Sequence, residues 1–371
     1  MNKRIVVKVG TKVLTAENGQ LDLNSIEHIV DQIAAIRRRG YEVLLVTSGA
    51  VGSGRALMKK QAGVGGKEET MADKQVFAAV GQVALMNTYA GYLKKHGIQS
   101  AQILVTKEDF RDRVHYRNME TCFLNVLRGD VLPIVNENDV VAVKELIFTD
   151  NDELAGLVAL ELDADEVIIL TSVEGVMAGD PKDPNARVIS EINVGDLRAA
   201  EKFVTADKTS SGRGGMLTKF AVARKLMSAG ITVHMANGKR KNVIVDILDG
   251  KSVGGKTVDG KSVGTRFVPQ KEVTSRKRHL AHGDSLARGS ITINKCLEER
   301  IFSHERAMSI LPVGIVAASG EFKKGDIIKV VGDKGKVIGC GIARADMEAV
   351  ARMAGVKGGR AVIHYDDLFV Y

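Results

Sequence analysis

Long apolar runs and cysteines are both scarce in this sequence of 371 residues. No run approaches the ~20 apolar residues that a membrane helix requires, and the apolar start of the chain stops at Lys8, too soon for a signal peptide. We therefore expect a cytoplasmic protein without membrane contacts. The three cysteines, Cys122, Cys296 and Cys340, are scattered and odd in number, which argues against a disulfide framework or a zinc site. We expect them to be buried and to serve as small apolar residues.

The composition is typical of a globular protein with substantial cores, since 44% of the residues are hydrophobic. A chain of this length predicts two or three domains. The formal net charge is +8, and residues 271–371 hold 17 basic against 12 acidic residues. This basic C-terminal part permits an anionic partner such as nucleic acid, although a modest excess of positive charge also serves solubility.

Short apolar runs alternate with helical patterns through the first 170 residues. The runs predict buried strands at 5–9, 43–46, 102–106, 131–135 and 167–170. We expect the first helix to begin at a cap on Asn24 or Ser25 and to end at Gly40, with further helices at 75–95, 116–128 and 154–162. A glycine-rich, charged stretch at 59–74 predicts a loop or lid. This order predicts an α/β fold with a mostly parallel sheet and right-handed crossovers.

A polar stretch at 136–152 follows the fourth of these strands. It opens with Asn-Glu-Asn-Asp and closes with Asp-Asn-Asp. Because ligands bind in the crevice beyond the carboxyl ends of parallel strands, we interpret this stretch as part of a functional site. Its carboxylates could hold a cation or the ammonium of an amino acid, or orient lysines from elsewhere. A solvated turn is the alternative, because Asn and Asp favour turns.

Three further features indicate an anion-binding site. Lys8 lies inside an apolar strand, where its charge is costly unless an anion meets it. The loop TSGAVGSG at 47–54 lacks the spacing of a P-loop or a dinucleotide site, but its glycines let backbone N–H groups approach an oxyanion, with Ser48 as an added donor. The segment TSSGRGGMLTK at 209–219 opens a helix with Lys219 in its first turn, which attracts phosphate. A tight turn and a flexible linker are the respective alternatives for the two glycine-rich segments.

Five short motifs together resemble those of the bacterial glutamate 5-kinases, members of the amino acid kinase superfamily. In order, they are VVKVGT at 6–11, TSGA at 47–50, NEND at 136–139, TDND at 149–152 and GGMLTK at 214–219. The resemblance implies an open, largely parallel sheet between helical layers. It also implies the reaction of ATP with L-glutamate to L-glutamyl 5-phosphate, the first step of proline biosynthesis, with ATP and Mg²⁺ required.

The resemblance assigns roles to individual residues. Lys8, Lys219 and Asp152 would be catalytic, with Asp152 orienting the two lysines. The glutamate-binding set would be Ser48, Gly49, Ala50, Asp139 and Asn151. The ATP-binding set would be Lys8, Gly10, Thr11, Thr171, Ser172, Arg213, Gly214, Gly215, Met216, Leu217, Thr218 and Lys219. The chain departs from the family at two of these positions, since Asp is common where Ser172 stands and Thr where Arg213 stands.

The chemistry fits these residue types. A γ-carboxylate with a reference pKa near ~4.3 is ionised at neutral pH, so it can attack phosphorus without a general base. Cations must then offset the repulsion between an anionic nucleophile and an anionic phosphate, and Lys8 and Lys219 could do so, with Mg²⁺ on the ATP oxygens rather than in a protein site. The carboxylates of Glu137 and Asp139 favour a free α-ammonium. An acetylglutamate kinase, or another kinase of the superfamily, is the alternative enzyme.

The organisation of the chain changes after residue 248. The sequence DGKSVG occurs at 249–254 and again at 259–264, which indicates a linker at 249–275 after a kinase domain at 1–268. Short β-type runs at 290–293, 315–317, 327–331 and 336–342 predict a small β-barrel. The string at 309–331 resembles a PUA domain, which we place at 276–358, followed by a C-terminal segment at 359–371.

The resemblance also implies partners. Family members suggest a homodimer or homotetramer, feedback inhibition by proline and a glutamyl phosphate reductase as the pathway partner. Because the PUA fold is shared with RNA-modifying enzymes, RNA is a possible ligand of the C-terminal domain. An RNA-binding protein with a secondary α/β part is therefore the alternative of a different class, although the tail has few aromatics for base stacking and no RNP-like motif.

Overall fold

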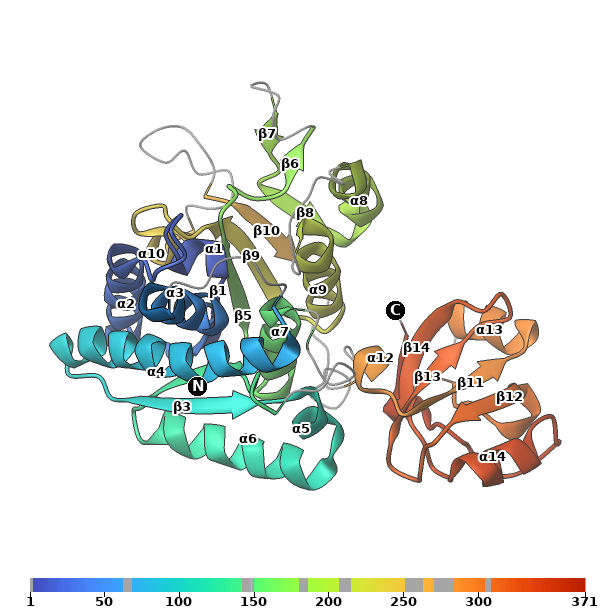
Figure 1. Cartoon of the computed structure of the whole chain (residues 1–371). Coiled ribbons are helices and arrows are strands. Elements are labelled where there is room, and N and C mark those ends of the chain that lie inside the picture. Colours follow the sequence, from blue (N-terminus) through green and yellow to red (C-terminus); the bar gives the residue numbers. More distant parts are fainter. Residues whose placement is uncertain are drawn as a thin grey trace. The chain divides into compact units, whose positions relative to one another are not determined.

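The computed structural model describes residues 3–62, 69–141, 148, 150–179, 186–206, 215–250, 263–269, 280, 283–303 and 308–370. Contacts within the chain define two compact units (Figure 1). The first contains residues 1–107, 117–227 and 231–270, and the second contains residues 108–116, 228–230 and 271–371. In the described part of the chain, no helix is long and apolar enough to cross a membrane.

A sheet of eight strands forms the centre of the first unit, in the order β3-β4-β2-β1-β5-β9-β10-β8. Among these strands, neighbours pair in parallel except β9 and β10, which are antiparallel. The α/β fold with a mostly parallel sheet is therefore confirmed. The strands are β1 Arg4–Val9, β2 Glu42–Val46, β3 Ser100–Val105, β4 Leu132–Glu137, β5 Glu166–Thr171, β8 Glu191–Asn193, β9 Thr232–Asn237 and β10 Thr265–Val268; β6 Met177–Ala178 and β7 Arg187–Val188 form a separate hairpin.

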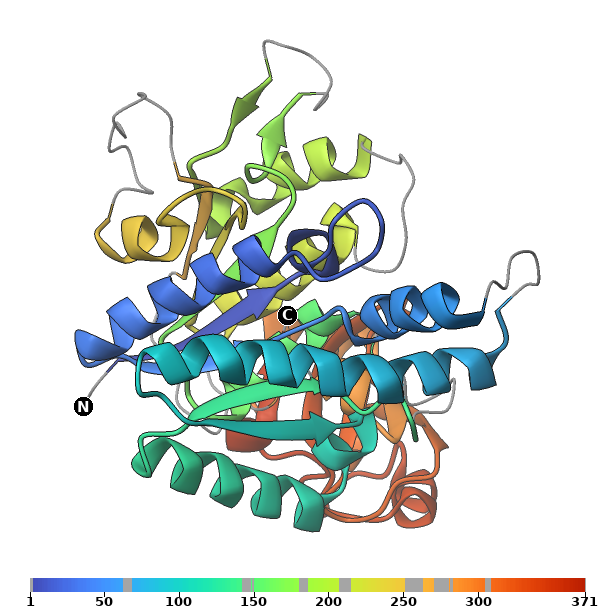
Figure 2. The same cartoon turned by 60° about the vertical axis from the view of Figure 1, so that its left-hand side comes forward.

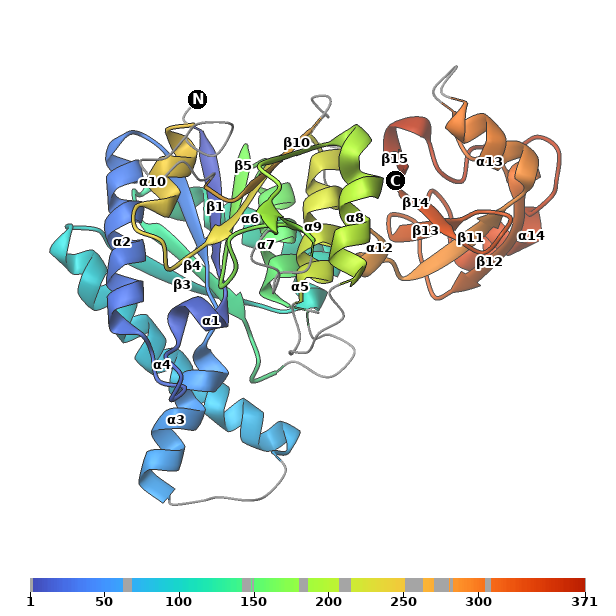
Figure 3. The same ribbon diagram turned by 90° about the horizontal axis from the view of Figure 1, so that it is seen from above.

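Helices cover both faces of the sheet, which explains why its inner strands are mostly apolar. Figure 3 shows α2 and α7 on opposite sides of β1 and β5, and α4 runs beside α3 (Figure 2). The helices of this part of the chain are α1 Thr11–Leu14, α2 Leu23–Arg38, α3 Ala50–Ala62, α4 Met71–Lys95, α5 Lys107–Arg111, α6 Arg113–Arg128, α7 Asn151–Glu161, α8 Leu197–Ala206, α9 Met216–Ser228 and α10 Val243–Leu248.

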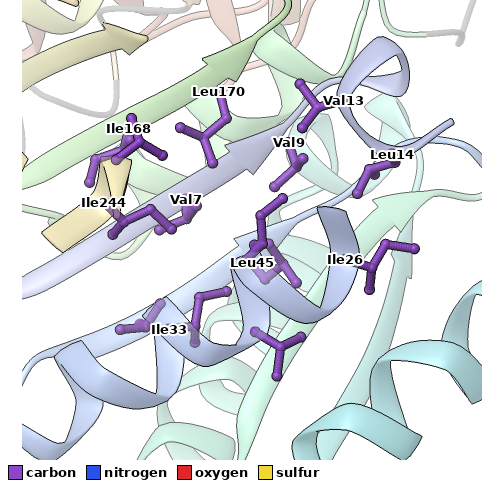
Figure 4. Close-up of a cluster of buried hydrophobic side chains, with 14 of the residues drawn as sticks. Val7, Val9, Val13, Leu14, Ile26, Ile33, Leu45, Ile168, Leu170 and Ile244 are labelled. Atoms are coloured by element: carbon purple, nitrogen blue, oxygen red, sulfur yellow. The ribbon is translucent and has the colours of Figure 1, made fainter. Parts of the chain in front are cut away.

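A single hydrophobic cluster joins one face of the sheet to its helices. Figure 4 shows side chains of β1, β2 and β5 packed against α2 and α10, with Leu45, Ile33 and Ile244 among them. Helix α4 adds Leu85 and Tyr89 to the same cluster. This packing holds the strands in register, so that the residues that follow their carboxyl ends have fixed positions.

Two local predictions were wrong. Asp22 caps α2, because its side chain accepts a hydrogen bond from the backbone N–H of Ser25; the prediction of a cap on Asn24 or Ser25 placed it two or three residues late. The predicted loop at 59–74 is shorter than expected, because α3 continues to Ala62 and α4 begins at Met71 with Thr70 as its cap. Residues 63–68 of that stretch lie outside the described residues.

The second unit contains a separate five-stranded sheet in the order β12-β11-β13-β14-β15. Its pairs are antiparallel apart from β11 with β13. The strands are β11 Gly289–Ile293, β12 Ile315–Gly320, β13 Ile327–Val331, β14 Val337–Ile342 and β15 Leu368–Val370, and the helices are α12 Gly283–Leu286, α13 Lys295–Phe302 and α14 Met347–Met353. This sheet has a hydrophobic core of its own. The four β-type runs expected from the sequence are confirmed, whereas β15 was not anticipated.

The cysteines differ in their surroundings. Cys340 on β14 is buried, as expected of a small apolar residue, but Cys122 and Cys296 are exposed, so the prediction of burial was wrong for these two. Both lie on helices, α6 and α13, whose outer faces they share with polar residues. Sequence spacing alone does not reveal which face of a helix a small residue occupies.

Candidate active site

A buried carboxylate between two lysines forms the centre of the site. Asp152, in the first turn of α7, is fully buried. Its Oδ1 lies 2.6 Å from Nζ of Lys8, in β1, and its Oδ2 lies 2.9 Å from Nζ of Lys219, in the first turn of α9. Both lysines are also buried, at 4% and 7% exposure. The structure therefore brings together the three residues that the resemblance assigns to catalysis, from three separate elements.

The charges in this triad do not cancel. Burial alone would raise the pKa of Asp152, but the ammonium groups of Lys8 and Lys219 outweigh burial and hold its pKa below the ordinary value. Asp152 is thus an anion at neutral pH, and two cations share it. The triad thus places two ammonium groups side by side, and these would attract the oxygens of a phosphate or carboxylate ligand.

Asp150 connects the helices that carry the triad. Its Oδ1 accepts hydrogen bonds from the backbone N–H groups of Asp152, at 2.9 Å, and Glu153, at 3.1 Å, and so caps α7. The hydroxyl of Thr218, in the first turn of α9, donates to Oδ2 of Asp150 at 2.8 Å. Burial, followed by the negative charge of Asp152, raises the pKa of Asp150. The start of α7 is therefore fixed to the start of α9.

A chain of side-chain amides extends from the same end of α7. The Nδ2 of Asn151 lies 3.0 Å from Oγ of Ser48 and 2.9 Å from Oδ1 of Asn136, and it also contacts the carbonyl oxygen of Thr47. Nδ2 of Asn136 donates in turn to Oε1 of Gln82, on α4, at 2.9 Å. Asn151 and Ser48, both assigned to glutamate binding, are thus in direct contact. Asn136 belongs to β4, which continues two residues beyond the end of the strand expected at 131–135.

A cavity of about 210 Å³ lies beside this chain of amides. This volume is below the ~300–1,000 Å³ of drug-sized ligand sites, so it suits a small molecule rather than a whole nucleotide. Two of the residues assigned to glutamate, Ala50 and Asp139, line it. The full lining is Ala50, Ala78, Ala79, Gln82, Val83, Gln102, Leu104, Glu137, Asn138, Asp139 and Val140.

The glycines of the loop at 47–54 have different roles. Gly49 turns the chain with a φ of +100°, which a residue with a side chain rarely adopts. Gly54 instead lies inside α3, where an added Cβ would come 1.9 Å from the carbonyl oxygen of Phe77 on α4. Gly52 also lies within α3. Close packing of two helices explains Gly54, so its interpretation as part of an oxyanion cradle was wrong. For Gly49 and Gly52 this interpretation stays a prediction.

The residues assigned to ATP lie where neighbouring elements end or begin. Gly10 and Thr11 follow β1, and Thr171 and Ser172 lie at the end of β5, the parallel neighbour of β1. Gly215, Met216, Leu217, Thr218 and Lys219 form the start of α9. Arg213 and Gly214 lie outside the described residues. The carboxyl end of β1, that of β5 and the amino end of α9 thus form one candidate nucleotide site.

Several site residues were missed from the sequence. Asp150 and Gln82 were not singled out, nor was Lys107, whose Nζ lies 2.9 Å from Oε1 of Glu153. A signal for Gln82 exists, because it interrupts the buried stripe of α4 that Ala78, Leu85 and Tyr89 otherwise form. A polar residue in an apolar stripe is a reason to look for a buried partner.

Comparison with protein families gives two matches. Residues 3–237 match the model of the amino acid kinase family, and residues 289–364 match that of the PUA domain. Over 368 residues the chain is 46% identical to a glutamate 5-kinase of Chlorobaculum tepidum, covering 99% of this chain and 97% of the relative. It is 44% identical over the same length to a glutamate 5-kinase of Bacteroides thetaiotaomicron, covering 99% and 98%.

A solved structure supports the fold. The carbamate kinase of Giardia lamblia bound to AMP-PNP superposes with a TM-score of 0.52, covering 72% of this chain and 98% of its own. The two sequences are only 18% identical. At this identity the likeness concerns the fold alone.

Proposed function

This chain belongs to the amino acid kinase family and also contains a PUA domain. From that premise we propose that the protein transfers the γ-phosphoryl group of ATP to the γ-carboxylate of L-glutamate. The product is L-glutamyl 5-phosphate, the first intermediate of proline biosynthesis. The observation that carries the proposal is the buried Lys8–Asp152–Lys219 triad, with a small cavity lined by carboxylates nearby.

The substrate carboxylate needs no base. With an ordinary pKa near ~4.3 it is ionised at neutral pH, so no proton has to leave when its oxygen attacks phosphorus. The barrier is electrostatic, because the nucleophile and the phosphate are both anions. Lys8 and Lys219 stabilise the negative charge on the transferring oxygens, and Asp152 keeps the two ammonium groups a fixed distance apart.

ATP supplies the phosphoryl group, and Mg²⁺ enters with it. Mg²⁺ is usually bound by substrate phosphates, water and at most a few carboxylates, so the nucleotide itself brings the ion. The amino end of α9 supports phosphate binding through the backbone N–H groups of its first turn and its dipole, next to Lys219. Asp150 holds this helix end against α7 through Thr218.

The cavity supports the free amino acid over its N-acetylated relative. Glu137 and Asp139 line it, and acidic residues favour an α-ammonium, whereas an acetamide carries no positive charge. We therefore rank glutamate above N-acetylglutamate as the substrate. Proline shares the α-carboxylate and the cationic amine but lacks the γ-carboxylate, so we also propose that it competes with glutamate without reacting.

Initial rates with four acceptors test the function directly. Glutamate, N-acetylglutamate, aspartate and UMP are each supplied with Mg·ATP, and ADP release is measured beside trapping of acyl phosphate as the hydroxamate. Glutamate should give the highest kcat/KM and a hydroxamate. ADP release with UMP or N-acetylglutamate at a higher kcat/KM would reject the proposed substrate.

RNA binding by the PUA domain is the second candidate function. The observation in its favour is a set of exposed basic residues in the second unit: Lys323, Lys324, Lys334, Lys336, Arg352, Lys357 and Arg360. Exposed basic side chains attract phosphates in a salt-dependent way. A gel shift with structured RNA at 50 and 200 mM salt tests it, and equal binding to an unrelated acidic polymer would leave only non-specific attraction.

A further inference from the structure

The hydrogen bonds around Asn136 fix the direction of the neighbouring amides. The backbone N–H of Glu137, which can only donate, lies 3.0 Å from Oδ1 of Asn136. Nδ2 of Asn151 donates to the same oxygen at 2.9 Å. The other branch of the Asn136 amide is therefore the NH₂ group, and it donates to Oε1 of Gln82 at 2.9 Å. This assignment comes from a backbone group, so it does not depend on a choice of amide flip.

Gln82 is left with a buried donor. Its Oε1 is occupied by Asn136, so its Nε2 is the free branch of the amide. Within the described part of the chain, this Nε2 has no hydrogen-bond partner, although Gln82 is only 9% exposed. A buried N–H without an acceptor is unfavourable, and native proteins rarely retain one without a reason. Gln82 also lines the 210 Å³ cavity, so a ligand in that cavity is a candidate acceptor.

The position of Gln82 indicates which end of a substrate it meets. Asn151 directly precedes Asp152 of the triad, the proposed place of phosphoryl transfer. Gln82 is separated from Asn151 by Asn136, that is, by two successive hydrogen bonds. The end of the substrate that reacts lies towards the triad, so the end near Gln82 is the one that carries the α-carbon.

We propose that Nε2 of Gln82 donates a hydrogen bond to the α-carboxylate of the amino acid substrate, which makes Gln82 a specificity-determining residue of this site. The proposal rests on the proposed function. The carboxylates of Glu137 and Asp139 line the same cavity and suit the α-ammonium. A donor and two carboxylates in one small cavity complement the zwitterionic head group of a free amino acid.

The test compares substrates that differ only in the head group. 4-Aminobutyrate keeps the ammonium and the reacting carboxylate of glutamate but lacks the α-carboxylate. Gln82→Met removes the donor, so kcat/KM for glutamate should fall about 10- to 100-fold, the range for a hydrogen bond to a charged group. With 4-aminobutyrate, measured as a substrate or as an inhibitor of glutamate turnover, the change should stay below about threefold. KM for ATP should not change.

A second variant separates binding from folding. Gln82→Glu keeps an oxygen that accepts a hydrogen bond from Nδ2 of Asn136, but it replaces the donor with a negative charge. It should therefore lower kcat/KM for glutamate more than Gln82→Met does and leave the value for 4-aminobutyrate little changed. Asn87→Asp makes the same change on an exposed face of α4 and serves as the control. Unfolding midpoints of all variants are measured in parallel.

The outcomes are distinct. A fall in kcat/KM for glutamate in both Gln82 variants, without a comparable change for 4-aminobutyrate, supports the proposal. If the variants affect glutamate and 4-aminobutyrate equally, or weaken ATP binding as much as glutamate binding, the proposal is overturned. Gln82 is then a structural partner of Asn136. If the wild-type protein does not phosphorylate glutamate, the proposed function fails whatever the variants do. If it does and Gln82→Glu retains the wild-type kcat/KM for glutamate, the role of Gln82 alone is rejected.

Discussion

Gly81 of α4 lies against Ala50 at the start of α3, so close that a Cβ on residue 81 would come 1.8 Å from the carbonyl oxygen of Ala50. No side chain fits in that space. The contact holds α4 against the turn that carries Ser48 and Gly49, and Ala50 itself lines the candidate substrate cavity. The distance between the two helices thus determines the position of one wall of the site.

Gly81→Ala should therefore destabilise the protein and weaken glutamate binding together. Overpacking of this kind costs about 1–3 kcal/mol, and relief of the clash must displace the Ala50 carbonyl. We expect a lower urea midpoint and a higher KM for glutamate, with KM for ATP little changed. Gly91→Ala on the same helix is the matched control, because nothing lies within 4 Å of its Cβ and an alanine there should stabilise α4. Unchanged KM and stability in Gly81→Ala would contradict this account of the contact.

Lys8→Met and Lys219→Met should each lower kcat at least about 100-fold, because a well-placed electrostatic contact to the transition state contributes that much. Each change also leaves Asp152 with a single cationic partner. Steady-state kinetics measure the effect, with circular dichroism as a check of folding. Lys94→Met, at an exposed position of α4, should leave kcat unchanged. A wild-type kcat in either active-site variant would remove that lysine from the mechanism.

Asp152→Asn should reduce both activity and stability, since it removes the carboxylate that both buried ammonium groups contact. Loss of one partner from a buried ion pair costs about 3–5 kcal/mol. The folded-state pKa of Asp152 is depressed, so its contribution is present above the unfolded pKa of 3.8 and is lost as pH falls through the folded value. The stability difference between wild type and Asp152→Asn should thus be large at pH 7 and shrink as the pH falls below about 4.

ATP provides a second readout for the same variant. Its phosphates can replace the missing negative charge between Lys8 and Lys219, so Mg·ATP should raise the Tm of Asp152→Asn more than that of the wild type. Thermal unfolding with and without nucleotide measures this. An equal or smaller shift in the variant would argue that the phosphates do not reach the two lysines.

Glu161→Gln should stabilise the protein at alkaline pH. Burial, together with the charge of Glu120, raises the pKa of Glu161 to about 9 from an ordinary 4.5, and neither carboxyl oxygen has a hydrogen-bond partner among the described residues. With a raised folded-state pKa, the wild type is most favoured below pH 4.5 and loses stability as pH rises towards 9. Urea midpoints should therefore differ little between the two proteins at pH 5 and favour Glu161→Gln at pH 8.5. The same difference at both pH values would mean that charge is not the cause.

A fragment of residues 1–270 should retain kinase activity, whereas a fragment of residues 1–250 should not fold correctly. The shorter one lacks β10, whose Phe267 packs edge-on against Phe220 with ring centroids 5.6 Å apart, directly beside Lys219. It also lacks Thr265, whose hydroxyl accepts a hydrogen bond from the N–H of Val176 at 2.8 Å. Glutamate-dependent ADP release and circular dichroism of both fragments test this. Activity in the shorter fragment would show that β10 is dispensable.

The central triad could be anticipated from the sequence because its members carry local signals. Lys8 is a charge inside an apolar strand, and Lys219 follows a glycine-rich segment at a helix start. Asp152 ends a polar stretch after a strand. Parallel strands then bring such ends to one edge of the sheet. The resemblance to the glutamate 5-kinases was still needed to join these three residues into one triad.

The rest of the site depends on contacts that no local pattern encodes. Gln82 meets Asn136 only because α4 packs against the carboxyl end of β4. The glycines of α3 resembled a phosphate loop, but Gly54 is set by the approach of Phe77 from another helix. Asp150 was assigned no separate role, because its two functions, as a cap of α7 and as a partner of Thr218, appear only when both helix ends are in place.

The order of strands in the large sheet also constrains how the protein is made. β10 lies between β9 and β8, and among the described strands it is the sheet neighbour of β8. A ribosome synthesises β8 long before β10, because residues 194–264 come between them. The strands from β1 to β5 can pair as soon as they emerge, but β8 has no place in the sheet until β10 arrives. Nascent chains halted before residue 265 should therefore hold Glu191–Asn193 open to proteases and chaperones, although most of the sheet has already formed.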